Sequence, residues 1–200
     1  MGAPTRANIM KSGAVIWYAP EGEALPDETS VNAGASWGGT WVRVGFTAAP
    51  VTFLYEDERM EIEVQEMLVA FDEWRTKESC TLTTALAEIT GEYMALLTGD
   101  TVTTVAAGAS QKGYEHFSVG NNDRVKVYAV GFEGIRYDAN NNALPFRLFI
   151  PRATFKMDGE IEFSRRTDVY VNLPITIKGL GDTSTGKVAI FQRVTAAATS

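Results

Sequence analysis

Hydrophobic and polar residues alternate along most of this chain, which is the pattern of half-buried β-strands. Turn-forming residues such as Gly120-Asn121-Asn122-Asp123 and Asp158-Gly159 separate the alternating segments. The pattern predicts strands over Ala14–Tyr18, Trp41–Val44, Val51–Tyr55, Met60–Glu66, Cys80–Glu88, Tyr114–Val119, Val125–Phe132, Phe146–Phe155, Glu160–Ser164, Val169–Leu173, Ile175–Lys178 and Val188–Val194. Many strands in succession predict a mainly β protein, an antiparallel β-sandwich or barrel.

One segment, Thr90–Leu97, has helical rather than alternating spacing. Thr90 is a suitable N-cap and Gly99 a suitable terminator, so a single short α-helix is expected to flank the sheets. Residues 1–200 are interpreted as one domain. Residues 19–40 have the composition of a long loop or arm.

The segment from Val51 to Gln65 changes phase halfway along. Its apolar residues stand at odd positions up to Tyr55 and at even positions from Met60 onward. We expect a bulge or turn within Glu56–Arg59, because an extra residue shifts the alternation by one position. With that shift, Met60, Ile62 and Val64 are predicted to face the sandwich core.

The charge of the chain, −7 overall, is unevenly distributed. Residues 51–78 contain nine acidic and three basic residues, a net −6, whereas residues 124–200 contain eleven basic and seven acidic residues, a net +4. An acidic surface repels nucleic acid, so tight DNA binding is disfavoured. The opposite signs of the two regions permit complementary contacts between copies of the chain. No apolar run reaches the roughly 18 residues of a membrane helix, so no membrane partner is expected.

Two stretches resemble ligand-binding loops without completing the motif. Residues 181–188 (GDTSTGKV) lack the Ser or Thr that follows the Lys of a phosphate-binding loop, and a strand rather than a helix follows, so a hairpin turn is favoured. Asp138–Asn142 begins like a calcium loop, but Ala143 and Phe149 stand where Gly and Glu are needed. An Asn-rich hairpin turn explains it better.

No residue constellation predicts an active site, a metal site or a cofactor. Cys80 is the only cysteine and is predicted to be a small buried hydrophobe, and His116, the only histidine, is predicted to lie on a strand. Trp37 and Trp41 could form a sugar-stacking platform, although anchoring the chain to the core is the favoured interpretation. Paired carboxylates occur at Glu61/Glu63 and Glu160/Glu162, a common feature of exposed strands.

Three stretches together resemble the tail tube protein, or major tail protein, of long-tailed, siphophage-type bacteriophages. They are Trp41–Tyr55 running into Met60–Gln65, then Lys77–Thr90 with the helix after it, and finally Phe149–Ala153, Gly159–Ser164 and Val171–Ile177. The opening Gly13–Pro20 also fits the start of such chains.

The resemblance implies a structural virion protein rather than an enzyme. Subunits of this family form hexameric rings whose strands join into one closed barrel, and stacked rings form a conduit for DNA ejection. The implied partners are further copies of the chain, the tape measure protein in the lumen, the tail terminator and tail tip proteins, and DNA in transit without specific binding. The implied location is the virion tail, assembled in the cytoplasm of the host bacterium.

Two parts of the chain are predicted to carry assembly. Glu61, Glu63 and Gln65 are expected to face the lumen, where carboxylates repel DNA. Residues 66–78 break the alternation and are expected to form an assembly loop, because exposed apolar side chains are typical of an interface. The residues expected in contacts between subunits or rings are Met67, Leu68, Phe71, Trp74 and Arg75.

Two alternative functions remain open from the sequence. A tail terminator of related fold would form one ring and stop. A carbohydrate-binding or glycoside-cleaving β-sandwich would use Trp37, Trp41 and the paired glutamates.

Overall fold

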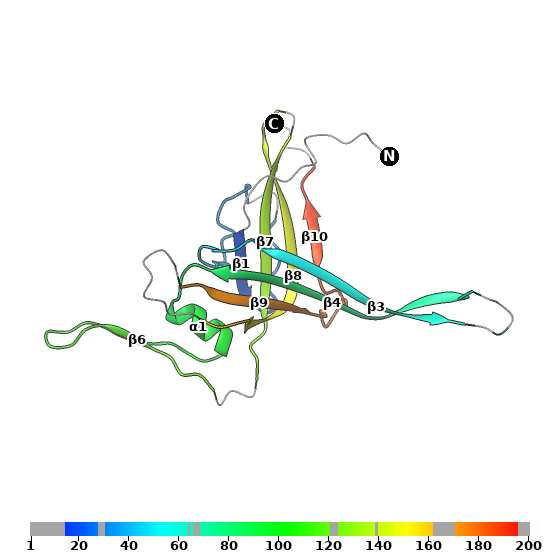
Figure 1. The fold of residues 1–200 in the computed structure, drawn as a ribbon. Helices are drawn as coiled ribbons and strands as arrows, with labels where there is room; N and C mark the ends of the chain where they lie inside the picture. The colour runs from blue at the N-terminus through cyan, green and yellow to red at the C-terminus, as the bar shows by residue number, and fades with distance from the viewer. Residues whose placement is uncertain are drawn as a thin grey trace.

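The fold is mainly β and antiparallel, with one short helix, as predicted (Figure 1). The computed structural model describes residues 15–27, 31–63, 65, 69–120, 124–138, 140–161 and 171–195. The elements are β1 (Val15–Pro20), β2 (Val42–Arg43), β3 (Thr52–Ile62), β4 (Asp72–Leu86), α1 (Gly91–Thr98), β5 (Thr103–Val105), β6 (Tyr114–His116), β7 (Tyr128–Tyr137), β8 (Ala143–Met157), β9 (Leu173–Leu180) and β10 (Ile190–Arg193).

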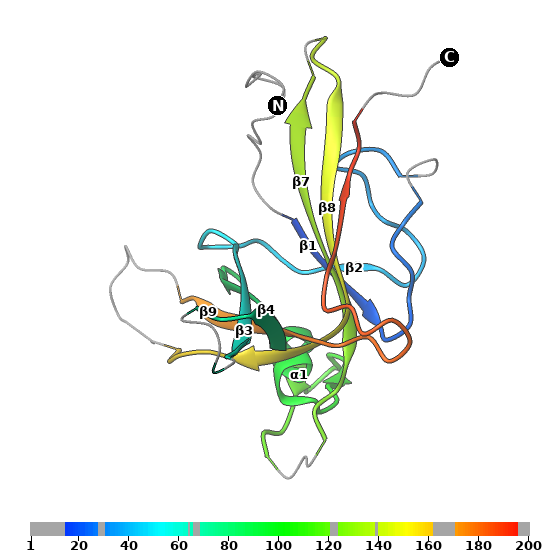
Figure 2. The ribbon, with the colours of Figure 1, turned by 90° about the vertical axis from the view of Figure 1, so that its right-hand side faces the viewer.

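Strand β8 belongs to two layers of the molecule. The main sheet has the order β2-β1-β7-β8-β9-β4-β3, and β10 also pairs with β8. Residues 146–149 of β8 pair with β10, and residues 152–157 pair with β9. β7, β8 and β10 stand upright in Figures 1 and 2, and β9 and β4 run across them in Figure 1, so the sheet folds over itself into a sandwich.

The core lies between these two layers. Alternate residues of the strands supply it, because every second side chain of a strand points to the same face. Its fully buried members include Ile16, Leu82, Leu148, Ile150 and Ile177. Burying a side chain of this size contributes roughly 1.5–3 kcal/mol, so this layer contact is the main source of stability.

Helix α1 begins and ends where the sequence predicts. The Thr90 hydroxyl accepts a hydrogen bond from the Tyr93 backbone N–H at 3.3 Å, and Gly99 closes the helix with φ 76°. Met94 and Leu96 from this helix join the core.

Three predictions for strands need correction. Strand β3 is continuous from Thr52 to Ile62, so the predicted break at residues 56–59 does not interrupt it. Strand β4 begins at Asp72 rather than at Cys80. A short hairpin of β5 and β6 lies at residues 103–116, and the sequence predicted only its second strand.

The two loops that resembled ligand sites are closed by their own side chains. The Asp182 carboxylate accepts hydrogen bonds from the backbone N–H groups of Ser184 (3.1 Å) and Thr185 (2.7 Å). With the Ser184 hydroxyl as the main cause, these bonds lower the Asp182 pKa to about 2. The turn is confirmed, but it is not a hairpin, because β9 and β10 both pair with β8.

The Asn-rich turn between β7 and β8 is confirmed as a hairpin turn. Asp138 accepts hydrogen bonds from the backbone N–H groups of Asn140 (2.9 Å) and Asn142 (2.8 Å), and Asn141 has φ 64°. Asn tolerates this left-handed conformation better than most residues.

Candidate assembly surface

The outer part of the β3–β4 hairpin extends well beyond the sandwich (Figure 1). At its inner end Phe53 packs against the core and Cys80 is fully buried, which confirms the prediction for this cysteine. From Glu56 outward on β3, and from Asp72 to Glu78 on β4, nearly every residue is exposed. We call residues 56–78 the outer hairpin.

A bulge lies in the outer hairpin, but on the partner strand. The register passes from Glu58↔Lys77 directly to Arg59↔Arg75, so Thr76 is the extra residue and β4 is the bulged strand. The Thr76 hydroxyl donates a hydrogen bond to the Glu58 carbonyl at 3.1 Å. An irregularity therefore lies where the sequence predicted one, but the extra residue is on β4 and not within Glu56–Arg59 of β3. The resulting register places Trp74 directly opposite Met60.

One face of the outer hairpin carries a network of ion pairs. Asp57 accepts hydrogen bonds from the guanidinium groups of Arg59 (2.6 Å) and Arg75 (3.2 Å). Arg59 also pairs with Glu73 at 3.1 Å, and Arg75 pairs with Glu78. The Arg59 bond is the main cause that lowers the Asp57 pKa, and the Arg75 bond is the main cause that lowers the Glu78 pKa. Because each arginine spans two acids, the network cross-links the two strands on this face.

The other face of the outer hairpin carries exposed apolar side chains beyond the Lys77–Glu58 ion pair. Met60 and Trp74 lie side by side on it with exposed fractions of 52% and 59%. Around the end of the hairpin, Val69 and Phe71 are exposed by 70% and 65%. The prediction that Met60 faces the sandwich core is therefore wrong, because β3 has already left the core when it reaches this residue. Exposed apolar side chains gathered in this way are typical of an interaction surface.

The structure places the predicted site residues on this hairpin as follows. Glu61 lies opposite Glu73, and Glu63 and Gln65 are exposed beyond the end of β3. Met67 and Leu68 lie outside the described residues, as do Val64 and Glu66. Phe71 and Trp74 are exposed, whereas Arg75 lies on the face that carries the ion-pair network, and from Asp72 onward the predicted assembly loop is strand.

The described part of the segment predicted to be a long loop or arm, residues 21–27 and 31–41, folds back onto the main sheet. Trp37 and Trp41 are only 4% and 7% exposed, and Trp37 stacks on Trp17 with ring centroids 5.7 Å apart. The core interpretation of these tryptophans is confirmed, and the sugar-stacking platform is wrong because neither ring is accessible.

A buried ion pair beneath this segment was missed by the sequence reasoning. Arg147 and Glu133, exposed by 0% and 2%, pair at 2.7 Å. Glu133 also accepts hydrogen bonds from the Gly34 backbone N–H (2.6 Å) and the Trp37 indole N–H (3.2 Å), and Arg147 donates to the Val31 carbonyl (3.0 Å). The available signal was the presence of charged residues inside otherwise apolar strands: Glu133 and Arg136 in GFEGIRY, and Arg147 in PFRLFIP.

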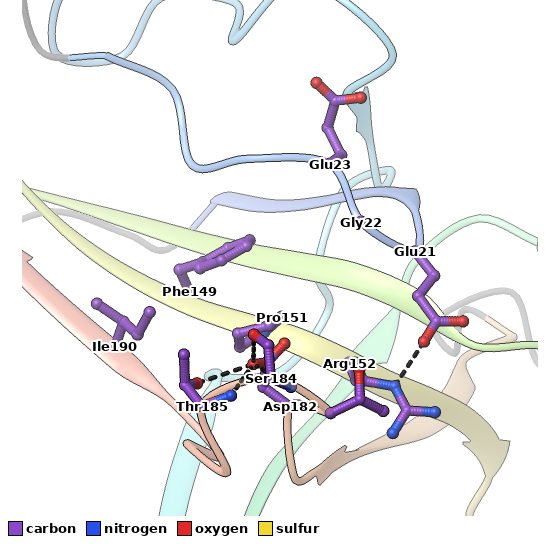
Figure 3. A pocket seen from close by; sticks show the side chains of 11 residues that line it. Glu21, Gly22, Glu23, Phe149, Pro151, Arg152, Asp182, Ser184, Thr185 and Ile190 are labelled. Atoms are coloured by element: carbon purple, nitrogen blue, oxygen red, sulfur yellow. Dashed lines mark hydrogen bonds and ion pairs between the residues drawn. The ribbon is translucent and has the colours of Figure 1, made fainter.

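A pocket of about 390 Å³ lies between residues 21–23 and the 182–185 turn (Figure 3). Its polar side chains bind one another: Arg152 pairs with Glu21 at 2.5 Å and donates to the Gly181 carbonyl at 3.0 Å. The Asp182 carboxylate accepts hydrogen bonds from the hydroxyl groups of Ser184 and Thr185, as the dashed lines in Figure 3 show. Because these polar side chains bind one another, the pocket is explained as part of the surface turn.

The described residues contain no group of three or more His, Cys, Asp and Glu side chains that could hold a metal ion. Within the same part of the chain, no helix is long and apolar enough to span a membrane.

Comparison with known proteins identifies a family. A family model described as "Phage tail tube protein" matches residues 1–196 of the chain. No curated protein matches it.

Proposed function

The chain belongs to the phage tail tube protein family, and from this premise we propose that it forms hexameric rings that stack into the tail tube of a siphophage. The tube serves as the conduit for DNA ejection, with the tape measure protein in its lumen before ejection and with terminator and tip proteins at its ends. The subunits assemble in the host cytoplasm, and the finished tube is part of the virion tail.

The exposed apolar face of the outer hairpin is the observation that carries this proposal. In a single chain, the apolar side chains of Met60, Phe71 and Trp74 are exposed to water on a projecting ribbon, which is energetically unfavourable. A second copy of the chain that covers them removes this apolar surface from water and so gains binding free energy. Strand β3 also ends the main sheet, so its outer edge is available for pairing between subunits.

We propose that the outward face of the β9-β4-β3 layer forms the channel wall within a ring. The register aligns threonines across it: Thr52 lies opposite Thr83, which lies opposite Thr176, and Thr81 lies opposite Lys178. Glu56 and Glu58 share this face of β3 by alternation and offset the charge of Lys178. A hydroxyl-rich wall of mixed charge suits DNA in transit, because it offers no cluster of cations for the phosphates.

We retain the proposal that Glu61, Glu63 and Gln65 reach the lumen, at the outer hairpin. By alternation Glu61 shares the strand face of Phe53 rather than that of Thr52. A two-stranded ribbon twists more strongly than a sheet, so its faces at the tip need not keep the direction they have in the sandwich. An electron-microscopy map of the tube with Glu61 and Glu63 pointing outward would contradict this assignment.

Negative-stain electron microscopy of the purified protein tests the function directly. The wild type is expected to form long tubes, and the double variant Phe71→Ser/Trp74→Ser is expected to remain as monomers or single rings. Tyr114→Ser is the matched control, because Tyr114 is also an exposed aromatic, at 55%, on the other hairpin. Tubes of unchanged length from the double variant would contradict the role of the hairpin. A wild type that stops at single rings would favour a tail terminator.

A further inference from the structure

An apolar groove lies beside α1, on the side of the molecule away from the outer hairpin (Figure 1). It has a volume of about 570 Å³, and its apolar lining includes Met94, Leu97, Val119, Val125 and Met157. Val119 and Val125 are exposed by 71% and 65%, so the groove leaves large side chains in contact with water. Its volume lies within the range of about 300–1,000 Å³ that buries drug-sized molecules, which leaves room for large aromatic side chains.

The rim of this groove is basic. Arg124, Lys126 and Lys156 line it. The outer hairpin carries the opposite charge, because acids outnumber the bases Arg59, Arg75 and Lys77 along residues 56–78. Asp72 flanks the apolar face directly, where its carboxylate accepts a hydrogen bond from the Trp74 indole N–H at 3.1 Å.

We propose that the apolar face of the outer hairpin of one copy docks in the groove beside α1 of another copy. Trp74 and Phe71 fill the groove, and the acids of the hairpin meet Arg124 and Lys126 at its rim. This inference rests on the proposed function and names the surface that receives the hairpin.

The geometry makes this contact heterologous, because it joins two different surfaces of the chain. The hairpin leaves the sandwich on the far side from α1, so it points away from the groove of its own chain (Figure 1). Each copy then presents a hairpin at one side and the groove at the other. Such a heterologous contact generates a filament if its rotation does not close and a ring if it does, and both kinds of contact occur in a tube of stacked rings.

Photocrosslinking within assembled tubes tests the contact. Phe71 is replaced by p-benzoylphenylalanine, the tubes are irradiated, and crosslinked peptides are identified by mass spectrometry. The expected crosslinks join residue 71 of one chain to residues 94–97, 119–126 or 154–157 of a second chain. Intact tubes whose crosslinks map elsewhere would overturn the inference while leaving the proposed function standing. A wild type that forms no tubes overturns both.

Charge reversal and tryptophan emission provide a second readout. Arg124→Glu/Lys126→Glu is expected to lower tube yield by about tenfold or more, because each lost contact of about 1.4 kcal/mol corresponds to tenfold. Lys187→Glu, an exposed lysine away from the groove, is the control. Trp17, Trp37 and Trp41 are already buried, so a blue shift of the emission on assembly reports the burial of Trp74. Val125→Asp should abolish this shift; tubes of full yield and a full shift in that variant would overturn the inference.

Discussion

Residues 21–41 and the outer hairpin differ in where their aromatic side chains find partners. The sequence predicts a long loop or arm at residues 19–40 and an assembly loop at residues 66–78, and both contain tryptophan. In the first segment, Trp37 and Trp41 are buried against the outer face of β1, β7 and β8. In the second, Trp74 is 59% exposed on a ribbon that has left the sheet. Tryptophan content alone therefore does not tell an intramolecular anchor from an intermolecular one.

The difference lies in what each segment meets. The first segment lies over the ion pair of Glu133 and Arg147, and its backbone and Trp37 supply the hydrogen bonds that a buried charge pair needs. The outer hairpin pairs its charges with one another and leaves Met60, Phe71 and Trp74 without cover among the described residues. The segment that covers a buried ion pair and hydrogen-bonds to it is thus the one that packs against its own chain.

Removing the buried acid should have the largest effect on the isolated chain. Glu133→Ala leaves the Arg147 charge buried without its carboxylate, and we expect a loss of about 3–5 kcal/mol in the free energy of unfolding. Urea denaturation followed by tryptophan emission measures it. Trp74→Ser is the comparison variant and should change this free energy by less than about 0.5 kcal/mol.

An equal loss in the two variants would contradict the distinction between the segments. The double variant Glu133→Leu/Arg147→Met should recover part of the loss, because replacing both charges leaves neither of them unpaired.

Crowding the contact between Trp37 and β7 should have an intermediate effect. A Cβ atom at Gly131 would lie 2.1 Å from the Trp37 ring, so Gly131→Ala forces the ring and the segment that carries it to shift. We expect a loss of about 1–3 kcal/mol in the free energy of unfolding. Gly108→Ala is the matched control, because a Cβ atom there meets nothing within 4 Å. A Gly131→Ala variant as stable as the control would show that Trp37 is not held against β7.

The smallest effect concerns the order of the outer hairpin at low pH. The pKa values of Asp57 and Glu78 are lowered by their arginine partners, so the network contributes fully above the usual carboxyl range, near pH 4, and is lost as the pH falls below it. NMR order parameters of residues 56–62 and 72–78 should fall from about 0.85 towards 0.6. Asp57→Asn should show reduced order already at neutral pH. Unchanged order in the Asp57→Asn variant at neutral pH would contradict the role of the network.

Local patterns were enough to predict much of the fold. Strict alternation predicted the strands that hold Cys80 and Ile177, and cap chemistry predicted both ends of α1, because these signals depend on a few neighbouring residues. Turn residues likewise predicted the Asp138–Asn142 hairpin.

Long-range pairing could not be predicted in the same way. Along β3 the apolar residues change from one face of the strand to the other while the strand itself stays regular. The bulge at this point lies on β4, at Thr76. No residue within β3 reveals this, because the extra residue belongs to a strand whose register is set at a distance. The pairing of Glu133 with Arg147 beneath Trp37 also joins residues far apart in the chain.

The passage of β8 through both layers has a mechanical consequence. Its first half pairs with β10 and its second half with β9, so one unbroken backbone runs from one layer into the other. A load on either layer reaches the other through peptide bonds and hydrogen-bonded ladders, and does not depend on side chains sliding past each other. The two layers of the sandwich therefore deform together under strain, as a single stiff element.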